Sequence, residues 1–341
     1  MAGDDTLRDS KRTILGVGGM SSPQSADDEL VGKLVVGRYV IEAEIGSGAF
    51  GKVYRGRHAK LNRPVAIKVL HSHLVHEPTI LERFRREAQL AARLAHPNVV
   101  GVLDRGETID GRQLMVLELA DGQPLTALLG DPLPRERIIR LVNQLLHGLE
   151  HAHAAGLVHR DLKPDNIIVE ARADGTEVPR IVDFGIAVLR DPEETFGSRL
   201  TATGQMIGTP LYMAPEQAKL ETVDHRADLF ALGVILYQML AGTTPFAGSA
   251  VEVAISNMSK DPPSIYHRTG LDADPLLERF ARKLMARQLE DRFSSARAAL
   301  HALDLIERDP DAAGPVLGKM DLDKAASVVS LPVPPTTTKR R

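Results

Sequence analysis

The sequence predicts a two-lobed α+β protein, in which a small lobe of antiparallel strands with one helix precedes a larger, mainly helical lobe. Three observations predict it. Between residues 38 and 118 apolar and polar side chains mostly alternate, which is the period of a half-buried strand. Beyond residue 118 apolar side chains recur at the 3.6-residue period of a helix. The composition, 43% hydrophobic and 26% charged over 341 residues, is that of a soluble globular chain long enough for such a fold.

The small lobe is predicted from three strand segments and one helix. Residues 39–45 alternate, and residues 65–70 form a run rich in β-branched side chains. The Asp-Gly pair at 110–111 predicts a hairpin turn into a further strand at 114–119. One helix interrupts this sheet, because the apolar residues between 84 and 94 lie about one turn apart.

The large lobe begins with a helical pattern at 138–149. A short strand-like interlude follows at 167–169 and 180–182. Helical patterns return at 224–242 and at 276–305. A sheet lobe followed by a helical lobe leaves a cleft between them, where we expect the ligand site.

The composition of the two ends predicts the domain boundaries. Residues 1–34 are rich in Gly, Ser and Asp, and residues 306–341 carry Pro, Ala and a Thr run, so both are expected to be flexible tails. Between them we expect one folded domain at 35–305. Its small lobe should occupy 35–119 and its large lobe 120–305.

Charge and cysteine content limit the function. With 42 Lys+Arg against 45 Asp+Glu, the formal net charge is −3, so no global positive field exists to hold nucleic acid or an anionic membrane. The chain has no Cys, which excludes disulfides, thiolate metal sites and cysteine nucleophiles and fits a reducing compartment. The longest apolar run, 229–242, is shorter than the ~20 residues that cross a bilayer, and the N-terminus has no signal-peptide pattern. We expect a cytoplasmic protein.

A glycine-rich segment, Gly-Ser-Gly-Ala-Phe-Gly at 46–51, lies between two expected strands. A dinucleotide-binding fold would need a helix after such glycines, whereas residues 53–55 continue as a strand. Glycines in a hairpin let backbone amides approach a phosphate with no side chain in the way. An ordinary glycine-rich turn remains the alternative reading.

The next segment, Val-Ala-Ile-Lys at 65–68, places one ammonium in an otherwise apolar strand. A buried lysine needs an anionic partner or loses its charge. Glu87, on the expected helix, is a candidate partner for Lys68. The alternative is an edge-strand lysine that reaches solvent.

The segment His-Arg-Asp-Leu-Lys-Pro-Asp-Asn at 159–166 is more specific. It puts four charged groups and an Asn between a long helix and a strand, and Pro164 prevents the helix from continuing. Such a loop can place one carboxylate to accept a proton, one cation to neutralise a phosphoryl oxygen and one amide oxygen to bind a metal. A solvated polar loop is the alternative.

Asp-Phe-Gly at 183–185 follows an expected strand, so that the carboxylate of Asp183 emerges at the strand end. Mg²⁺ prefers oxygen ligands and keeps phosphates as co-ligands, so that Asp183 and Asn166 are sufficient as protein ligands. Taken singly, the tripeptide is a common turn, and its position after the preceding segments makes it informative.

Five ordered segments resemble the eukaryotic-like (Hanks-type) serine/threonine protein kinases of bacterial type over about residues 38–305. They are the segments at 46–51, 65–68, 159–166, 183–185 and Ala-Pro-Glu at 214–216.

The resemblance implies the bilobal protein kinase fold and a role for each polar residue. Lys68 would hold the α- and β-phosphates of ATP and pair with Glu87. Asn166 and Asp183 would hold Mg²⁺ or Mn²⁺. Asp161 would be the base that takes the proton of the substrate hydroxyl.

The substrate class also follows from the resemblance. Lys163, two residues after Asp161, is what the serine/threonine branch carries. Gly-Thr-Pro at 208–210 indicates the same branch, with Thr209 expected to hydrogen-bond near Asp161 and Lys163. The implied substrates are therefore Ser or Thr residues of proteins, and Lys163 joins the expected catalytic residues.

The segment between Asp183 and Glu216 resembles the activation segments of kinases that become ordered on phosphorylation. Arg160 directly precedes Asp161, and Thr201 and Thr203 resemble the paired autophosphorylated threonines of bacterial relatives. A phosphate adds nearly two negative charges, which could hold the loop against Arg160. We expect autophosphorylation in trans at both threonines, through a homodimer.

The nucleotide site is located by the same resemblance. Leu117 would lie at the back of the adenine pocket, and residues 118–120 would form a hinge that offers backbone hydrogen bonds. These apolar side chains are also the expected core of the β lobe. The expected nucleotide contacts are Ile45, Gly46, Ser47, Gly48, Gly51, Val53, Ala66, Lys68, Glu87, Leu117, Glu118 and Ala120.

Two further residues are expected to support the structure. Asp228 lies in a helix that is apolar on nearly every face, so it requires a buried partner, and the resemblance gives it the backbone amides of the 159–161 loop. Arg292 resembles the arginine that pairs with Glu216. The chain departs from many relatives in lacking a Ser after Asp228 and in a longer turn at 171–179.

Two other functions remain as alternatives. A catalytically silent module would bind nucleotide without transferring phosphate, but such proteins usually lack the lysine, the base or a metal ligand, and none is missing here. A small-molecule phosphotransferase would not keep both the Gly-Thr-Pro segment at 208–210 and the Ala-Pro-Glu segment at 214–216.

Overall fold

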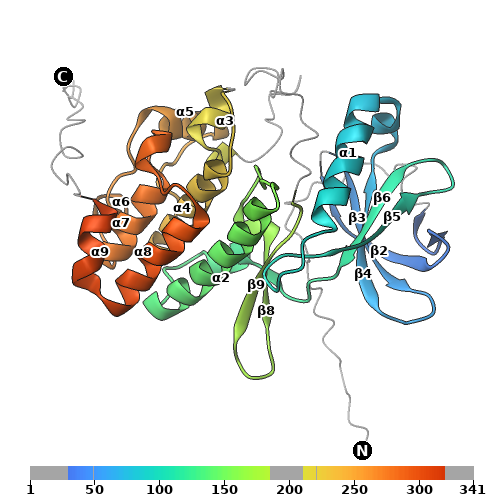
Figure 1. The fold of residues 1–341 in the computed structure, drawn as a ribbon, viewed down its shortest axis with the longest axis horizontal. Helices are drawn as coiled ribbons and strands as arrows, with labels where there is room; N and C mark the ends of the chain where they lie inside the picture. Colours follow the sequence, from blue (N-terminus) through green and yellow to red (C-terminus); the bar gives the residue numbers. More distant parts are fainter. Residues whose placement is uncertain (1–29, 49, 185–209, 220, 319–341) are drawn as a thin grey trace, which may run out of the picture.

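An antiparallel sheet and a helical lobe lie side by side in the computed structural model, which describes residues 30–48, 50–184, 210–219 and 221–318 (Figure 1). This arrangement confirms the predicted two-lobed α+β architecture. The sheet has the order β1-β2-β3-β4-β6-β5, and each neighbouring pair is antiparallel. Its elements are β1 Leu34–Val35, β2 Tyr39–Ser47, β3 Gly51–His58, β4 Pro64–Leu70, α1 Pro78–Ala91, β5 Val102–Glu107 and β6 Gln113–Glu118.

The helical lobe contains a small second sheet of order β7-β8-β9. Its elements are β7 Gln123–Pro124, α2 Arg135–Ala154, β8 Ile167–Ala171, β9 Glu177–Ile181, α3 Pro215–Lys219, α4 Arg226–Ala241, α5 Ala250–Ser259, α6 Ile265–Thr269, α7 Pro275–Leu284, α8 Ala296–Arg308 and α9 Pro310–Leu317. In this lobe α4 packs against α7, α2 and α6, whereas α9 lies at the outer end against α8 and α7 (Figure 1).

Strand β4 has two different faces because side chains alternate along a strand. Val65, Ile67 and Val69 belong to one core cluster of the sheet. Ala66 and Lys68 therefore point to the other face, where Lys68 is only 7% exposed. The pairing of β4 with its neighbours in the middle of the sheet thus fixes a buried ammonium on the face away from that cluster.

One glycine at the start of β3 is required by close strand packing. A Cβ built on Gly51 would lie 2.1 Å from the carbonyl oxygen of Val69 on β4. Any side chain at this position would push the two strands apart at the glycine-rich end of the hairpin. The glycine therefore serves sheet packing as well as the turn.

Helix α1 packs on both lobes. Phe84 and Ala88 share a cluster with Leu70 and Met115 of the sheet. Ala91, at the C-terminal end of the helix, belongs to the core of the helical lobe. The helix thus joins the two hydrophobic cores.

A second connection follows α1. Val99 forms a parallel bridge with Ile181 of β9, and the amide of Val100 donates to the carbonyl of Ile181 over 2.9 Å. Asn98 accepts from the amide of Ile181 at 2.8 Å. The segment before β5 is therefore hydrogen-bonded to the helical lobe.

The folded region is wider than the expected 35–305. Leu30 is 3% exposed in the core of the sheet, so the small lobe begins before residue 35. Helix α9 lies in the segment expected to be a flexible tail, where Ala313 and Leu317 are buried against the helical core. Asp309 caps it by accepting from the amide of Ala312 over 3.2 Å, and Arg279 of α7 donates to Gly314 over 2.8 Å. Buried helical structure therefore continues beyond residue 305, because the burial of this short helix outweighs its Pro and Gly content.

Within the described ranges, none of the helices combines the length and the apolar character that a membrane crossing requires.

Candidate active site

The loop at 159–166 is anchored by one buried carboxylate. Asp228, in the first turn of α4, accepts from the backbone amides of His159 and Arg160, each over 2.8 Å. His153, near the end of α2, donates to the same carboxylate from Nε2 over 2.8 Å. Burial works to raise the pKa of Asp228, but these hydrogen bonds and the nearby imidazoles outweigh burial, so the pKa is lowered. The anchoring expected for Asp228 is confirmed, and His153 was missed.

His159 connects this loop to the segment that carries Asp183. Its Nδ1 accepts from the amide of Asp161 at 3.3 Å, so its Nε2 carries the proton and donates to the carbonyl of Val182 over 2.9 Å. Its ring also contacts Phe184 edge-on, with 4.9 Å between the ring centroids. His159 is fully buried, and so it fixes the distance between the two segments.

Asp161 is hydrogen-bonded to two of the other expected catalytic residues. Lys163 donates from Nζ to Oδ2 of Asp161 over 3.2 Å. Asn166 donates from Nδ2 to the backbone carbonyl of Asp161 over 2.9 Å. Because its amide nitrogen is used in this way, Asn166 keeps its side-chain oxygen for another ligand. The backbone carbonyl of Asn166 accepts from the amide of Val182 at 2.9 Å, which brings this loop against the Asp183 segment.

Lys68 meets Asp183 in this structure. The distance from Nζ of Lys68 to Oδ2 of Asp183 is 3.0 Å. Asp183 has a φ of 63°, a left-handed conformation that is uncommon for a residue other than glycine. The strand of the small lobe and the segment after β9 are thereby joined by an ion pair.

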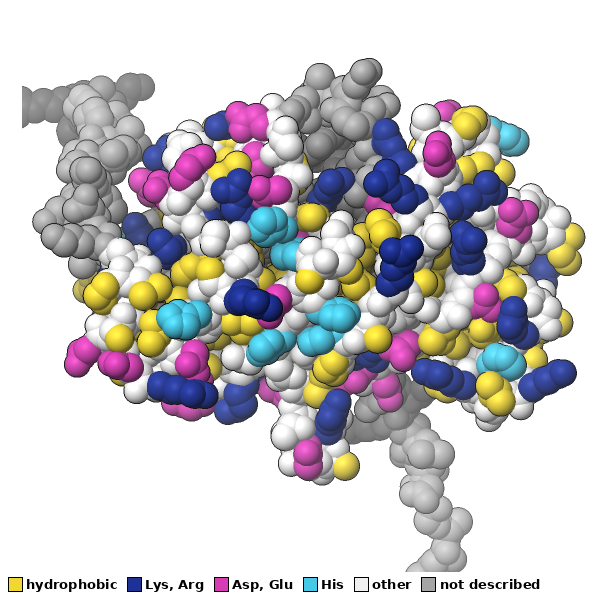
Figure 2. All heavy atoms as spheres, in the orientation of Figure 1, with side chains coloured by type: hydrophobic (Ala, Val, Ile, Leu, Met, Phe, Trp, Pro, Cys, Tyr) yellow, Lys and Arg dark blue, Asp and Glu magenta, His cyan; other side chains and the backbone are white. Residues whose placement is uncertain are grey.

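The expected pair between Lys68 and Glu87 is not formed, because Asp183 takes the ammonium instead. Glu87 is 5% exposed, and neither of its carboxylate oxygens has a hydrogen-bond partner among the described residues. Burial raises its pKa from 4.5 to about 8, against the positive charges of Arg160, Arg83 and Arg86. Figure 2 shows basic side chains gathered over α1.

The expected glycine-rich residues lie at the ends of β2 and β3. Gly46 and Ser47 end β2, and Gly51 begins β3. The amide of Gly48 donates to the carbonyl of Gly51 over 2.9 Å, which closes the turn. Ala49, at the tip, lies outside the described residues.

The expected adenine contacts lie on neighbouring strands. Ala66 of β4 is directly opposite Leu117 of β6, and Val53 of β3 is opposite Lys68. Val53 and Ala66 are buried, whereas Ile45 is half-buried at the end of β2.

A small apolar cluster joins the hinge to the helical lobe. Ala120 is buried together with Val100 and Ile168, and Leu117 and Val182 pack against them. Val100, Ile168 and Val182 were not predicted as site residues from the sequence. The available signal was that Ile168 lies two residues after Asn166, in a strand whose alternation turns it away from Ile167.

The hinge residue Glu118 is held by basic side chains. Its carboxylate pairs with Arg180 of β9 and, at 3.3 Å, with Arg63 before β4. Arg180 also lies 3.6 Å from Glu170 of β8. Burial opposes ionisation, but the Arg180 hydrogen bond and charge outweigh it and lower the pKa of Glu118. Glu118 was expected in the nucleotide site for its backbone, and the structure adds an ion-pair network between the lobes.

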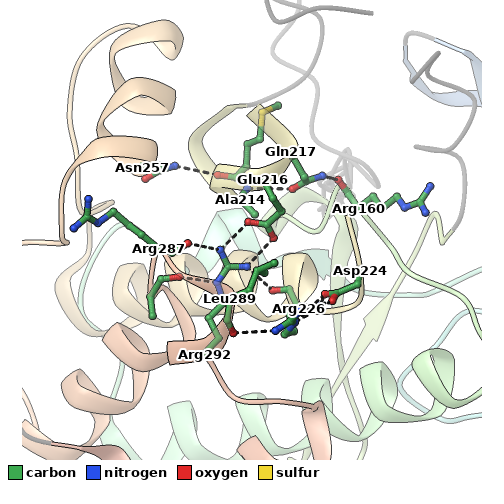
Figure 3. A network of polar contacts seen from close by, with 12 residues as sticks. Arg160, Ala214, Glu216, Gln217, Asp224, Arg226, Asn257, Arg287, Leu289 and Arg292 are labelled. Atoms are coloured by element: carbon green, nitrogen blue, oxygen red, sulfur yellow. Dashed lines mark hydrogen bonds and ion pairs between the residues drawn. The ribbon is translucent and has the colours of Figure 1, made fainter. Parts of the chain in front are cut away.

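The pair between Glu216 and Arg292 is confirmed and is fully buried. Arg292 donates from Nη1 and Nη2 to the two carboxylate oxygens over 2.7 and 2.8 Å. It also donates to the backbone carbonyls of Ala286 over 2.6 Å and Arg226 over 3.1 Å. Figure 3 shows the guanidinium at the centre of this network. Helix α3, which carries Glu216, is thereby fixed to the loop before α8.

Several expected site residues lie outside the described part of the chain. They are Gly185, the two threonines expected as phosphosites, Thr201 and Thr203, and Thr209.

Comparison with known proteins gives one family. The protein kinase domain family matches residues 39–303. The chain is 42% identical over 293 residues to the serine/threonine-protein kinase pkn3 of Myxococcus xanthus, covering 84% of this chain and 53% of that protein. It is 38% identical over 240 residues to the serine/threonine-protein kinase PknL of Mycobacterium tuberculosis, covering 69% and 57%. The chain thus spans about half the length of these relatives.

A solved structure shows the same fold. The crystal structure of the Mycobacterium tuberculosis PknI kinase domain superposes with a TM-score of 0.61 at 27% identity. The match covers 81% of this chain and 98% of that domain.

Proposed function

The chain belongs to the protein kinase family and carries a domain of the bacterial serine/threonine type, and we propose that it transfers the γ-phosphate of ATP to Ser or Thr hydroxyls of proteins. Members of this family use ATP with a divalent metal ion. One observation carries the proposal. A continuous series of direct contacts runs from Lys68 through the Asp183 segment and Asn166 to the backbone carbonyl of Asp161.

Asp161 acts as the base. Lys163 occupies its Oδ2, so that Oδ1 is the oxygen that accepts the proton of the substrate hydroxyl. The hydroxyl oxygen then bonds to the γ-phosphorus as the bond to the leaving ADP oxygen breaks. The ammonium of Lys163 stabilises the negative charge that develops on the transferred group. The hydrogen bond from Asn166 to the Asp161 backbone keeps the base in place.

Lys68 and the two metal ligands hold the triphosphate. The ammonium of Lys68 is buried, so an anionic partner such as a phosphate oxygen is strongly preferred there. Asp183 and Asn166 contribute a carboxylate and an amide oxygen, the hard donors that suit Mg²⁺ or Mn²⁺. The ion supplies charge neutralisation on the phosphate oxygens. Asp183 keeps its Oδ1 for this purpose, because Lys68 contacts its Oδ2.

The same domain phosphorylates itself on Thr201 and Thr203, in trans between two copies. The support comes from Arg160, next to the base. Its Nε is buried and has no hydrogen-bond partner among the described residues, so a phosphate oxygen would satisfy it. Mass spectrometry of protein incubated with ATP tests this step, and two unmodified threonines in fully active protein would contradict it.

Phosphate transfer is tested with labelled ATP, Mg²⁺ and a generic basic protein as acceptor. We expect label on Ser or Thr, and a loss of about a hundredfold or more in Asp161→Asn, because positioned proton transfer contributes that much. Chelation of the metal should abolish the label. The alternative is a nucleotide-binding module. It would show calorimetric binding of ATP with Mg²⁺ but no transfer of label to any acceptor.

A further inference from the structure

The peptide unit before the base has a strained backbone. Arg160 has a φ of 63°, in the left-handed region that residues other than glycine rarely adopt. A residue keeps such a conformation only where its surroundings hold it from several sides. Because Asp161 comes next in the chain, the direction of its side chain depends on this peptide unit.

Two side chains hold Arg160 from opposite ends of its backbone. Its amide donates to Oδ1 of Asp228 over 2.8 Å. Its carbonyl accepts from Nε2 of Gln217 at 2.7 Å. Figure 3 shows Gln217 reaching from α3 toward the Arg160 backbone. Asp228 lies in α4, in the core of the helical lobe, whereas Gln217 lies on α3.

Gln217 uses both ends of its side-chain amide. Its Oε1 accepts from the backbone amide of Ala214 over 3.1 Å, while Nε2 donates to Arg160. One partner is a donor and the other is a carbonyl, so only one orientation of the amide satisfies both. A carboxylate keeps the first bond and loses the second, and an apolar side chain loses both.

The backbone of Gln217 is held in place by the contacts of helix α3. The preceding residue, Glu216, is held by the bidentate contact with Arg292. Ala214 is fully buried. The side chain of Gln217 therefore extends from a rigid support, so that a hydrogen bond from it can restrain a strained backbone.

We propose that Gln217 is a positioning residue for phosphoryl transfer, which fixes the carbonyl of Arg160 so that the carboxylate of Asp161 faces the acceptor hydroxyl. This inference rests on the proposed function, in which Asp161 is the base. Gln217 touches neither nucleotide nor acceptor in this account, and it acts only through the Arg160 peptide unit. It couples the Ala-Pro-Glu segment to the catalytic loop.

The test compares Gln217→Glu with Gln238→Glu in the full chain. Both glutamines are half-buried. Gln238 accepts from the hydroxyl of Tyr212 at 2.7 Å, a bond that a carboxylate also accepts, so this variant makes the same chemical change without touching the loop. For each protein the measurements are kcat and KM with a generic basic protein, calorimetric binding of Mg²⁺ with a non-hydrolysable ATP analogue, and Tm.

We expect Gln217→Glu to lower kcat about tenfold, because one lost hydrogen bond to a fixed carbonyl changes an equilibrium by up to roughly that factor. Nucleotide binding should stay within about twofold of wild type, since Lys68 and Asp183 are untouched. Gln238→Glu should keep the wild-type kcat. Gln217→Met, which removes both hydrogen bonds and has a similar size, should also lower kcat and serves where Gln217→Glu does not fold.

A wild-type kcat in Gln217→Met or Gln217→Glu overturns the inference. So does a parallel loss of kcat, nucleotide binding and Tm, which would mean a general structural role. Failure of the proposed function gives a different result. In that case the wild type itself transfers no phosphate, and Asp161→Asn is indistinguishable from it.

Discussion

Replacing Glu87 with Gln should make the protein more stable at neutral pH. Glu87 is buried in α1, and its pKa is raised from 4.5 to about 8 by burial. The folded state therefore holds a proton on this carboxyl that the unfolded state releases above about pH 4.5. Stability from this group is fully present below that pH and is lost as the pH rises toward about 8. Gln carries no ionisable group, and it avoids this loss.

The size of the effect follows from the two pKa values. At about 1.4 kcal/mol per pKa unit, the wild type loses roughly 5 kcal/mol between the two limits. At pH 7 the loss is about 3 kcal/mol, and at pH 5 it is below about 1 kcal/mol. The difference in the free energy of unfolding between Glu87→Gln and wild type should grow by these amounts as the pH rises.

Urea unfolding between pH 5 and pH 8 measures this difference. Glu82→Gln is the matched control, because Glu82 lies on the exposed side of the same helix. Its difference from wild type should stay small and should not change with pH. A difference for Glu87→Gln that is flat across the pH range, or a variant less stable than wild type at pH 7, would refute the reasoning that this carboxyl is buried with no hydrogen-bond partner in the described part of the chain.

Three further outcomes are expected. Arg292→Lys cannot keep the bidentate contact with Glu216 and leaves a poorly compensated buried charge, so it should lower stability by about 3 kcal/mol and the Tm by several degrees in calorimetry. Asp228→Asn presents an N–H group to a backbone amide, so thermal stability and kinase rate should fall together; an inactive variant of unchanged Tm would argue against anchoring. Glu118→Gln weakens the contact with Arg180 that steadies the hinge. KM for ATP should therefore rise about fivefold, corresponding to about 1 kcal/mol, with kcat nearly unchanged. An unaltered KM in steady-state kinetics would contradict this expectation.

The parts of the site that the sequence predicts are those in which one residue type demands a particular partner. Asp228 stands in a helix that is otherwise apolar, so that a buried set of donors had to exist, and the resemblance to kinases identified them as loop amides. The pair between Glu216 and Arg292, 76 residues apart, was expected from the resemblance to kinases alone. Fold class followed from periodicity, because strands and helices bury their apolar faces at different spacings.

The remaining features depend on how elements pack, which local pattern does not reveal. Lys68 lies within the reach of two acids in the expected fold, and which one it meets depends on the placement of α1 and on the left-handed backbone of Asp183. Arg180 shows its role only when β9 lies beside the hinge. For α9 a signal existed, since Asp309 and Pro310 form a helix start, but the composition favoured a tail.

Because α1 packs on both lobes, its C-terminal end is fixed to the helical lobe while the rest of the helix rests on the sheet. Ala91 is embedded in the helical lobe, whereas Phe84 and Ala88 rest on the sheet. A rotation of one lobe relative to the other would keep the C-terminal end of α1 with the helical lobe. The N-terminal part of α1 would then change its angle to that lobe. Glu87 lies only about one turn from the fixed end at Ala91, so this rotation displaces its carboxylate little. Bringing its carboxylate to a new partner requires the helix to roll about its own axis.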